Sequence, residues 1–232
     1  MKRLAIIPAR GGSKRIPRKN VKPFLGKPVI AYSIEAALAS ELFDEVMVST
    51  EDEEIAAVAR EYGATVPFMR SAAAADDFAT TLDVLLEVLD AYRERGTEIV
   101  SACCIYAAAP FVTAARLREA DDLLRARELD CVFPVLRFGF PIQRALRLSA
   151  TNTVEMFSPE HLTTRSQDLE AAFHDAGMFY TFNVARVRAA GKLYTENSGC
   201  LVVPELEAHD IDTPEDWEAA EFKYRLLRER RG

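Results

Sequence analysis

Short apolar runs alternate with longer stretches of helical periodicity over most of this chain. Each run has the length and composition of a buried β-strand. The runs cover residues 4–7, 45–50, 99–106, 131–135 and 201–203, with a shorter extended piece at 65–68. The pattern therefore predicts a sheet whose strands are spread along the whole sequence.

The segments between the runs carry apolar residues at helical spacing. We expect helices over residues 28–38, 51–62, 80–95, 113–127 and from 214 to about 230. Acidic residues open the second of these, where they suit the positive end of a helix, and Gly63 is placed to end it. Strands that alternate with helices pair in parallel through right-handed crossovers. The expected fold class is α/β, with a mostly parallel sheet flanked by helices.

The alternation stops after Leu136. From residue 137 to about 201 there is little helical period, and the short alternating runs at 145–148 and 153–157 are typical of antiparallel hairpins. We expect one domain spanning residues 1–232 with a small β-rich insertion at about 137–200. Such an insertion would be a lid or a dimer arm rather than a second domain.

A loop rich in glycine and basic residues follows the first predicted strand. Pro8 should end that strand because it has no N–H to donate. Gly11 and Gly12 allow a tight turn whose N–H groups can approach an anion. The surrounding basic residues are Arg10, Lys14, Arg15, Arg18 and Lys19. The loop is neither the GxxxxGK[ST] type nor the GxGxxG type. A polyphosphate is the expected ligand, and the alternative is a simple turn with solvated bases.

Ligands of a parallel sheet bind beyond the carboxyl ends of its strands. The loop at 10–20, Thr50, Tyr106 and the segment around Pro134 are expected at that edge. Near the other end of the chain, an extended backbone would place Asp210 and Asp212 on the same side. Two such carboxylates suit Mg²⁺, which keeps phosphate and water as further ligands. Alternatively, Asp212 or Thr213 simply caps the helix that Pro214 begins.

Composition narrows the class of protein. The chain has 232 residues, of which 49% are hydrophobic and 28% charged, as in an ordinary globular protein. The net charge of −7 argues against a broad nucleic-acid or anionic-membrane surface, so any anion site must be local. No signal peptide precedes Leu4 and no apolar stretch approaches membrane-spanning length, so we expect a cytoplasmic protein. Cys103 and Cys104 lie in an apolar run and are expected to be buried thiols.

A polyphosphate loop combined with magnesium carboxylates indicates a class of reaction. A nucleophile attacks phosphorus, and catalysis consists mostly of positioning and charge neutralisation. No Ser/His/Asp set is apparent by spacing, and the three histidines lack the spacing of a zinc site.

The loop IPARGGSKRIPRKN at residues 7–20 resembles the signature of the CMP-sialic acid synthetase family of cytidylyltransferases. The similarity spans essentially the whole chain. Arg70, the segment 76–77, the segment 109–111 and the segment 210–212 stand where family members have their characteristic blocks. Three further segments, 104–111, 141–146 and 173–180, resemble the pseudaminic acid branch of the family.

This resemblance implies a Rossmann-like fold, CTP as substrate, Mg²⁺ as cofactor and a homodimer whose arm helps to complete the partner's site. The implied reaction transfers CMP to the anomeric hydroxyl of a nine-carbon acidic sugar and releases pyrophosphate. Pseudaminic acid is the sugar that the resemblance favours. The implied nucleotide-binding residues are Ala9, Arg10, Gly11, Gly12, Ser13, Lys14, Lys19, Asn20, Arg70 and Ala75. Asp210 and Asp212 would hold the metal, and Arg10 and Lys19 would join them in catalysis. The implied sugar-binding residues are Tyr106, Gln143, Arg144, Arg165, His174, Asp175 and Tyr180.

Departures from the family pattern keep alternatives open. Sialate enzymes commonly carry a Gln-Pro-Thr-Ser-Pro-type segment where this chain has Tyr106 to Pro110, and the pseudaminate pattern usually has Gln where Met178 stands. Tyr180 could be a core aromatic residue, and His174 with Asp175 a surface pair. The competing functions are a cytidylyltransferase for N-acetylneuraminate or another keto-deoxy sugar acid and a non-catalytic nucleotide-binding module. A base for the sugar hydroxyl is not identified, although a metal-bound water or hydroxide could serve.

Overall fold

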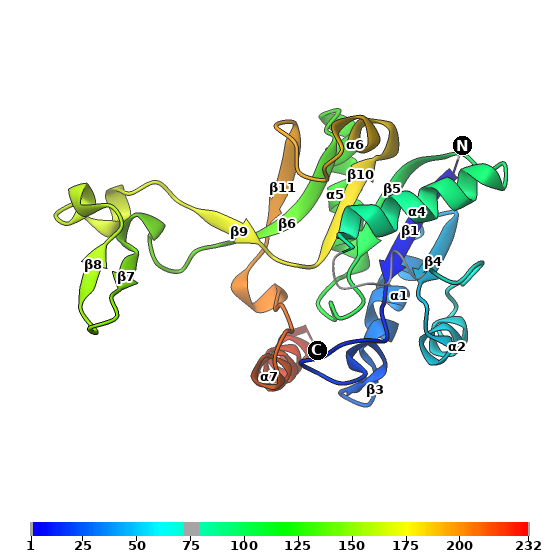
Figure 1. Cartoon of the computed structure of the whole chain (residues 1–232), viewed down its shortest axis with the longest axis horizontal. Coiled ribbons are helices and arrows are strands. Elements are labelled where there is room, and N and C mark those ends of the chain that lie inside the picture. Colours follow the sequence, from blue (N-terminus) through cyan, green and yellow to red (C-terminus); the bar gives the residue numbers. More distant parts are fainter. Residues whose placement is uncertain (1, 72–78, 232) are drawn as a thin grey trace.

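A twisted seven-stranded sheet forms the centre of the molecule (Figure 1). The computed structural model describes residues 2–71 and 79–231. Along the sheet the strands lie in the order β11, β6, β10, β5, β1, β4, and β9 pairs with β6 beyond the end of β10. The bounds are β1 Lys2–Pro8, β4 Glu45–Ser49, β5 Ile99–Ile105, β6 Cys131–Arg137, β9 Phe173–Asp175, β10 Phe179–Asn183 and β11 Ser198–Val202.

Five of the seven strands of this sheet, β1, β4, β5, β6 and β11, run in the same direction, which confirms the predicted α/β class. β1 pairs in parallel with β4 and β5, and β11 pairs in parallel with β6. β10 is the main exception, because it lies antiparallel between β5 and β6. Its direction follows from the route of the chain, which leaves the end of β6 and comes back beside it without a crossover helix.

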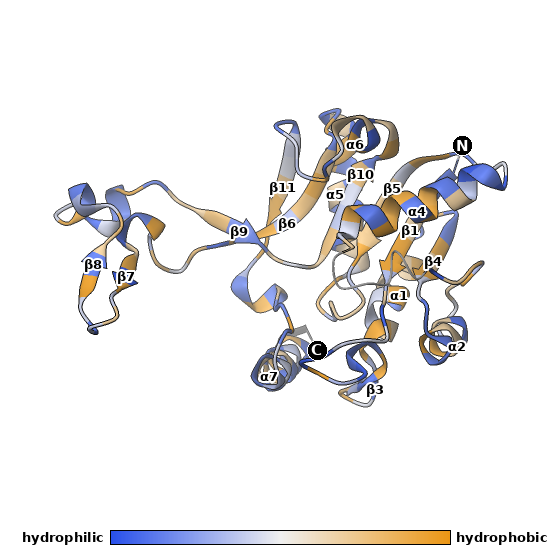
Figure 2. Ribbon diagram, in the orientation of Figure 1, coloured by the Kyte–Doolittle hydropathy of each residue, from blue (hydrophilic) through white to orange (hydrophobic). Residues whose placement is uncertain are grey.

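Helices cover both faces of the sheet and so make a three-layer sandwich. α1 (Val29–Ser40), α2 (Glu53–Glu61) and α5 (Ala114–Ala126) pack on one face with Ala5 and Ile7 of β1. α4 (Thr81–Glu94) and α6 (Val184–Ala190) pack on the other face with Leu4 and Ile6. Alternate residues of β1 thus enter opposite cores, as side-chain alternation along a strand requires. Figure 2 shows apolar residues concentrated in these central strands.

The predicted helices are confirmed, with ends fixed by local hydrogen bonds. Asp52 caps α2 by accepting from the Ile55 N–H at 3.0 Å. Thr80 and Asp83 form a reciprocal capping box at the start of α4. Gly63 follows α2 at a φ of +92°, a conformation that glycine adopts without strain. The last helix, α7 (Pro214–Arg231), also begins where expected.

An aromatic cluster fixes α7 against the N-terminal part of the fold. Phe24 lies edge-on to Tyr32, Trp217 and Tyr224, with ring centroids 5.4–5.7 Å apart. Phe24 belongs to a small ladder of β2 (Pro23–Phe24) and β3 (Lys27–Pro28), which follows the 3₁₀ turn η1 (Lys19–Val21). The glycine-rich loop therefore ends on a segment that is packed directly under the last helix.

Residues 138–172 form an arm that projects away from the sheet (Figure 1). It carries the antiparallel hairpin of β7 (Leu146–Leu148) and β8 (Val154–Met156), in agreement with the predicted hairpin strands. The arm also contains three 3₁₀ turns, η2 (Ile142–Arg144), η3 (Pro159–His161) and η4 (Ser166–Asp168). Outside the arm, the turn η5 (Glu205–Glu207) precedes α7. None of the helices in the described ranges combines the length and apolar character needed to cross a bilayer.

Three sequence-based expectations need adjustment. The insertion expected at 137–200 is shorter, since β10, α6 and β11 belong to the main body. β10 is buried on both faces and α6 spans only seven residues, so neither gives a clear period. The segment around Pro134 was expected at the ligand-binding edge of the sheet, but Pro134 lies inside β6. It stands opposite the break between β9 and β10, so its missing N–H costs no hydrogen bond of the sheet. Within residues 65–68, Thr65 alone pairs with the sheet, at Met47.

Candidate active site

A cavity of about 680 Å³ lies where the segments that follow β1 and β5 meet the segment that precedes α7. It is the place that a parallel sheet offers to a ligand. The described residues that line it are Pro8, Arg10, Ser13, Lys14, Arg15, Lys19, Asn20, Thr81, Tyr106, Ala107, Ala108, Gly177, Asp210, Ile211 and Asp212. The structure therefore brings the basic loop and the two predicted metal carboxylates to one site.

Side chains at the end of the loop close it and join it to the carboxylate segment. The buried Asn20 donates from Nδ2 to the carbonyl oxygen of Arg10 at 2.9 Å. Lys19 donates from Nζ to the carbonyl oxygen of Ile211 at 2.7 Å and lies 3.7 Å from a carboxylate oxygen of Asp212. Arg15 pairs with the same oxygen of Asp212 at 2.9 Å. The two bases and Asp212 neutralise one another.

The helix cap does not explain the two aspartates. The hydroxyl of Thr213 accepts from the N–H of Asp216, and the carboxylate of Asp216 accepts from the N–H of Thr213 at 2.7 Å. This reciprocal pair caps α7, so Thr213 is the capping residue. Asp210 and Asp212 instead line the cavity.

The environment of Asp210 disfavours its charged form. The residue is exposed at the mouth of the cavity, yet its carboxyl group lies against Gly177. Burial, and then repulsion from Asp212, raise the pKa of Asp210, while Lys19 opposes the rise. A second cation at this point would relieve the repulsion. Within the described residues no set of three or more His, Cys, Asp or Glu side chains is arranged around one metal position, so the pair offers two ligands. That number suits Mg²⁺, which is commonly bound by one or two carboxylates and by substrate phosphates.

The turn at Gly177 supports Asp210 from behind. Gly177 has a φ of +64°, and a Cβ atom there would lie 3.3 Å from Cγ of Asp210. The Gly177 N–H donates to Asp175 at 2.8 Å, and the hydroxyl of Tyr180 donates to the other oxygen of that carboxylate. Sequence reasoning missed Gly177. The single glycine in the segment 173–180 was the available signal for a close backbone approach.

Aromatic residues form one wall of the site. Tyr106 lines the cavity, and its ring lies edge-on to that of Tyr180 at 5.8 Å. Tyr180 also packs on Phe133 at 5.4 Å, and burial raises its pKa. Of the predicted sugar contacts, Tyr106 therefore lies at the cavity, whereas Tyr180 and Asp175 stand behind it. Met178 is buried in the core, so the position where the pseudaminate pattern has Gln points inward here.

Several predicted nucleotide contacts are engaged with other protein groups. Ala9 is buried, and its N–H donates to the carbonyl oxygen of Ser49 at 2.9 Å. The Gly11 N–H, expected to face a phosphate, donates to Glu51 at 2.7 Å. Arg70 is buried and donates to the hydroxyl and the carbonyl oxygen of Ser49, and desolvation lowers its pKa. Gly12 is exposed beside the lining residues, and Ala75 lies outside the described residues.

The remaining predicted sugar contacts belong to the arm and its return strand. Gln143 donates to the carbonyl oxygen of Glu170 at 3.0 Å, Arg144 donates to Ser166 at 3.3 Å, and Arg165 pairs with Asp168 at 2.8 Å. His174, on β9, packs its ring against Phe138 at 4.9 Å. None of these four is among the described residues that line the loop cavity. The predicted site residues thus fall into two separate groups within one chain.

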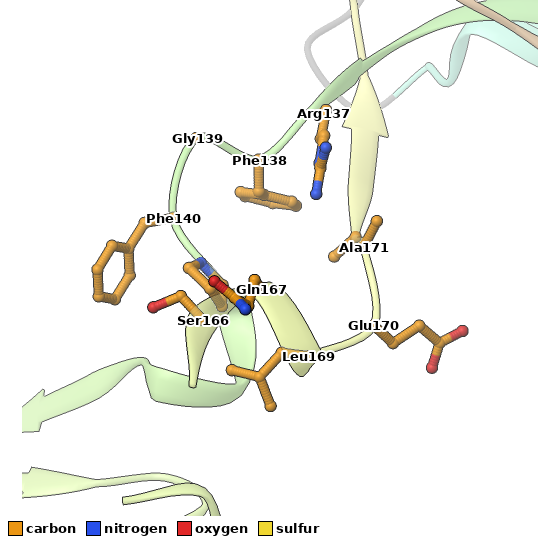
Figure 3. Close-up of a pocket in the computed structure, with 11 residues that line it drawn as sticks. Arg137, Phe138, Gly139, Phe140, Ser166, Gln167, Leu169, Glu170 and Ala171 are labelled. Carbon is orange, nitrogen blue, oxygen red and sulfur yellow. The ribbon is translucent and has the colours of Figure 1, made fainter. Parts of the chain in front are cut away.

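A second cavity, of about 420 Å³, lies at the root of the arm (Figure 3). Arg137, the last residue of β6, and the following Phe138 and Phe140 come from the segment that enters the arm, and Leu169 and Glu170 from the segment that returns from it. Figure 3 shows the side chains of Arg137 and Phe138 between these two segments. The cavity combines aromatic rings with a guanidinium group at the junction of arm and body.

Comparisons with known proteins agree with this geometry. Residues 4–195 match the sequence profile of a family described as cytidylyltransferase. The chain is 42% identical to a pseudaminic acid cytidylyltransferase of Campylobacter jejuni over 229 residues, covering 99% of both chains. It is 30% identical to a CMP-N,N'-diacetyllegionaminic acid synthase of Legionella pneumophila, again over 99% of both chains. A solved CMP:2-keto-3-deoxy-manno-octonic acid synthetase complexed with CTP shares the fold, with a TM-score of 0.69 at 19% identity, covering 98% of this chain and 100% of that one.

Replacement of Gly177 by Ala tests whether this turn positions Asp210, and Gly191→Ala is the matched control. Both glycines have a φ of +64°, but nothing lies within 4 Å of a Cβ at Gly191. Each substitution should lower the free energy of unfolding by about 1 kcal/mol and the melting temperature by about 2–4 °C. Only Gly177→Ala should also reduce turnover, because its methyl group displaces the Asp210 carboxylate. Equal turnover in the two variants would show that the turn does not position Asp210.

Proposed function

The chain belongs to the cytidylyltransferase family, as residues 7–20 indicated, and from this premise we propose that it transfers CMP from CTP to the anomeric hydroxyl of pseudaminic acid, releasing pyrophosphate. The observation that carries the proposal is the contact of Lys19 with the 210–212 segment. This contact puts a phosphate-binding loop and a pair of carboxylates on the same cavity. A nucleotide-binding module without catalysis would have no need of the two aspartates.

The loop provides charge for the polyphosphate of CTP. Arg10, Ser13, Lys14 and Arg15 line the cavity beside Lys19. Arg15 and Lys19 are paired with Asp212. When CTP binds, its phosphate oxygens replace Asp212 as the partner of these bases, because they carry more negative charge. Lys19 then stabilises the charge that accumulates on pyrophosphate as it leaves.

The released carboxylate completes a cation site. Asp210 and Asp212 would hold Mg²⁺, and the two-carboxylate donor set at the cavity fits that ion. Bound there, the cation would supply charge neutralisation to the phosphate groups of CTP. Gly177 keeps Asp210 in place, and the Lys19 contact with Ile211 keeps the segment close to the loop. The residues thus align the phosphorus for attack by the sugar hydroxyl.

Pseudaminic acid is favoured as the acceptor over other sugar acids. The pseudaminic acid cytidylyltransferase of Campylobacter jejuni is 42% identical to this chain, whereas the diacetyllegionaminic acid synthase is 30% identical. Tyr106 lines the cavity beside Ala107 and Ala108, where the sialate enzymes have a polar segment. This aromatic and aliphatic wall suits a deoxygenated sugar better than a polyhydroxylated one, since it offers few hydrogen bonds.

We also propose a cytoplasmic location, because the reaction consumes CTP, which the cytoplasm supplies.

A homodimer would unite the two groups of site residues. The arm exposes a set of large apolar side chains: Phe138, Phe140, Ile142, Leu146, Leu148, Val154, Phe157 and Leu162. An apolar surface of this extent is typical of an interface. Gln143, Arg144 and Arg165 belong to the same arm, which projects away from the sheet (Figure 1), and none of them is among the described residues that line the cavity of their own chain. In the proposed dimer the arm covers the partner's cavity and brings these groups to the carboxylate and hydroxyls of the sugar.

Pyrophosphate release with a panel of nucleotides and sugars tests the reaction. CTP with pseudaminic acid should be the best pair. UTP should be poorer by about 10⁴-fold, since a site that hydrogen-bonds the amine of cytosine rejects the analogue that lacks it. Equal rates with CTP and UTP would exclude a cytidylyltransferase. Faster release with N-acetylneuraminic acid than with pseudaminic acid would assign the protein to another acceptor.

Asp210→Asn and Asp212→Asn test the cation site. Each should reduce turnover by about 10²-fold or more, because a main electrostatic stabiliser of the transition state is removed. Each should also weaken binding of Mn²⁺ to the CTP complex, measured by calorimetry, while circular dichroism stays unchanged. Normal Mn²⁺ affinity and near-normal turnover for Asp210→Asn in limiting metal would show that these carboxylates are not ligands.

A further inference from the structure

Two acidic residues at the start of α2 hold the glycine-rich loop at both of its ends. Near the start of the loop, Glu51 accepts from the Gly11 N–H at 2.7 Å. Near its end, Arg18 donates two hydrogen bonds to Asp52, one of them at 2.9 Å, and a third to Glu54. Ser13, Lys14 and Arg15, which line the cavity, lie between these two attachments. We propose that Glu51 and Asp52 are positioning residues that shape the loop for CTP, an inference that rests on the proposed nucleotide substrate.

The first attachment is a partly buried polar network. Oε2 of Glu51 is buried, has no hydrogen-bond partner among residues 2–71 and 79–231, and lies 3.8 Å from the guanidinium group of Arg70. Arg70 is itself held by Ser49, at the end of β4. The buried guanidinium group of Arg70 and the half-buried carboxylate of Glu51 compensate each other's charge. Glu51 therefore connects the loop to the sheet through Arg70, and this gives Arg70 a role in CTP binding that needs no contact with the nucleotide.

The second attachment uses one of the loop's own bases. Arg18 is not among the described lining residues of the cavity, and its backbone has a φ of +55°, which is unfavourable for a residue with a side chain. The ion pair with Asp52 holds it there. The same hydrogen bonds lower the pKa of Asp52 to about 2 and raise that of Arg18, so the pair is fully charged at neutral pH. Arg18 thus fixes the loop instead of binding phosphate.

Close packing explains why the first glycine is required. A Cβ atom on Gly11 would lie 2.5 Å from a carboxylate oxygen of Asp52, whereas nothing lies within 4 Å of one on Gly12. Gly11 therefore lets the loop lie directly on the start of α2. With both ends attached, the loop has fewer conformations to lose when CTP binds. Releasing either end should weaken CTP binding and leave the sugar site unaffected.

Calorimetric titration of CTP, combined with steady-state kinetics in each substrate, tests the proposal. Asp52→Asn keeps a side chain that can cap α2 but removes the charge that holds Arg18. We expect it to raise the Kd and KM for CTP about tenfold, with the KM for the sugar and the melting temperature nearly unchanged. Arg18→Gln should act similarly, and the double variant should be no weaker than the weaker single variant, since both remove one contact.

Glu51 is tested by a conservative pair of variants. Glu51→Ala leaves the Gly11 N–H without an acceptor and should raise the Kd for CTP about tenfold. Glu51→Gln keeps an acceptor for the Gly11 N–H but loses the charge that faces Arg70, so its Kd for CTP should lie between those of the wild type and of Glu51→Ala. The control is Asn183→Ala, which removes the cap of α6 and should lower the melting temperature without changing the Kd for CTP.

The outcomes separate this inference from the proposed function. If the wild type binds CTP and Asp52→Asn and Glu51→Ala match it in Kd, the positioning role is wrong and the proposed function stands. An equal rise in KM for CTP and for the sugar would also overturn it, because a general loss of structure explains that result. If the wild type itself takes no CTP, the proposed function fails and this inference fails with it.

Discussion

The active site depends on contact between two segments that lie far apart in the sequence. Lys19 reaches across 192 positions to the carbonyl oxygen of Ile211, between the two aspartates. The packing of Phe24 on Trp217 holds the backbones of the same two regions together. Because both segments follow main-sheet strands, the sheet determines their separation. A loop with basic residues and a pair of carboxylates become one site only through this arrangement.

Much of the fold follows from sequence periodicity. β1, β4, β5 and the helices between them were predicted within a few residues, since each buries a regular apolar pattern against the next layer. The same logic failed for β10 and α6. A strand that is buried on both faces shows no alternation, and a helix of two turns shows no period. Their place in the sheet is a property of the tertiary structure, since β10 fills the gap that the departing arm leaves between β5 and β6.

The candidate site was only partly accessible to sequence reasoning. Arg10, Ser13, Lys14, Lys19, Asn20, Asp210 and Asp212 line the predicted cavity, because the motif and the edge of the sheet specify where they go. The acids at the start of α2 were attributed to the helix dipole, which hid the contacts of Glu51 and Asp52 with the loop. Gly177 was missed for a similar reason. A partner that is distant in sequence leaves no spacing to detect.

The arm sets the strongest constraint on how the enzyme works. Lys19 lines the cavity, whereas Arg165 of the same chain pairs with Asp168 on the arm. The proposed reaction nevertheless requires groups that bind the sugar next to the nucleotide. We therefore propose that a complete site combines the loop of one chain with the arm of its partner. In such a dimer, each site draws on both subunits.

Subunit complementation tests this claim most directly. Lys19→Ala and Arg165→Ala chains, carrying different affinity tags, are co-expressed, and the mixed dimer is isolated by both tags. One of its two sites then combines an intact loop with an intact arm, so about half of the wild-type turnover should return although each variant alone is impaired. A mixed dimer that stays as inactive as its parents, or a chain that forms no dimer, would contradict the account.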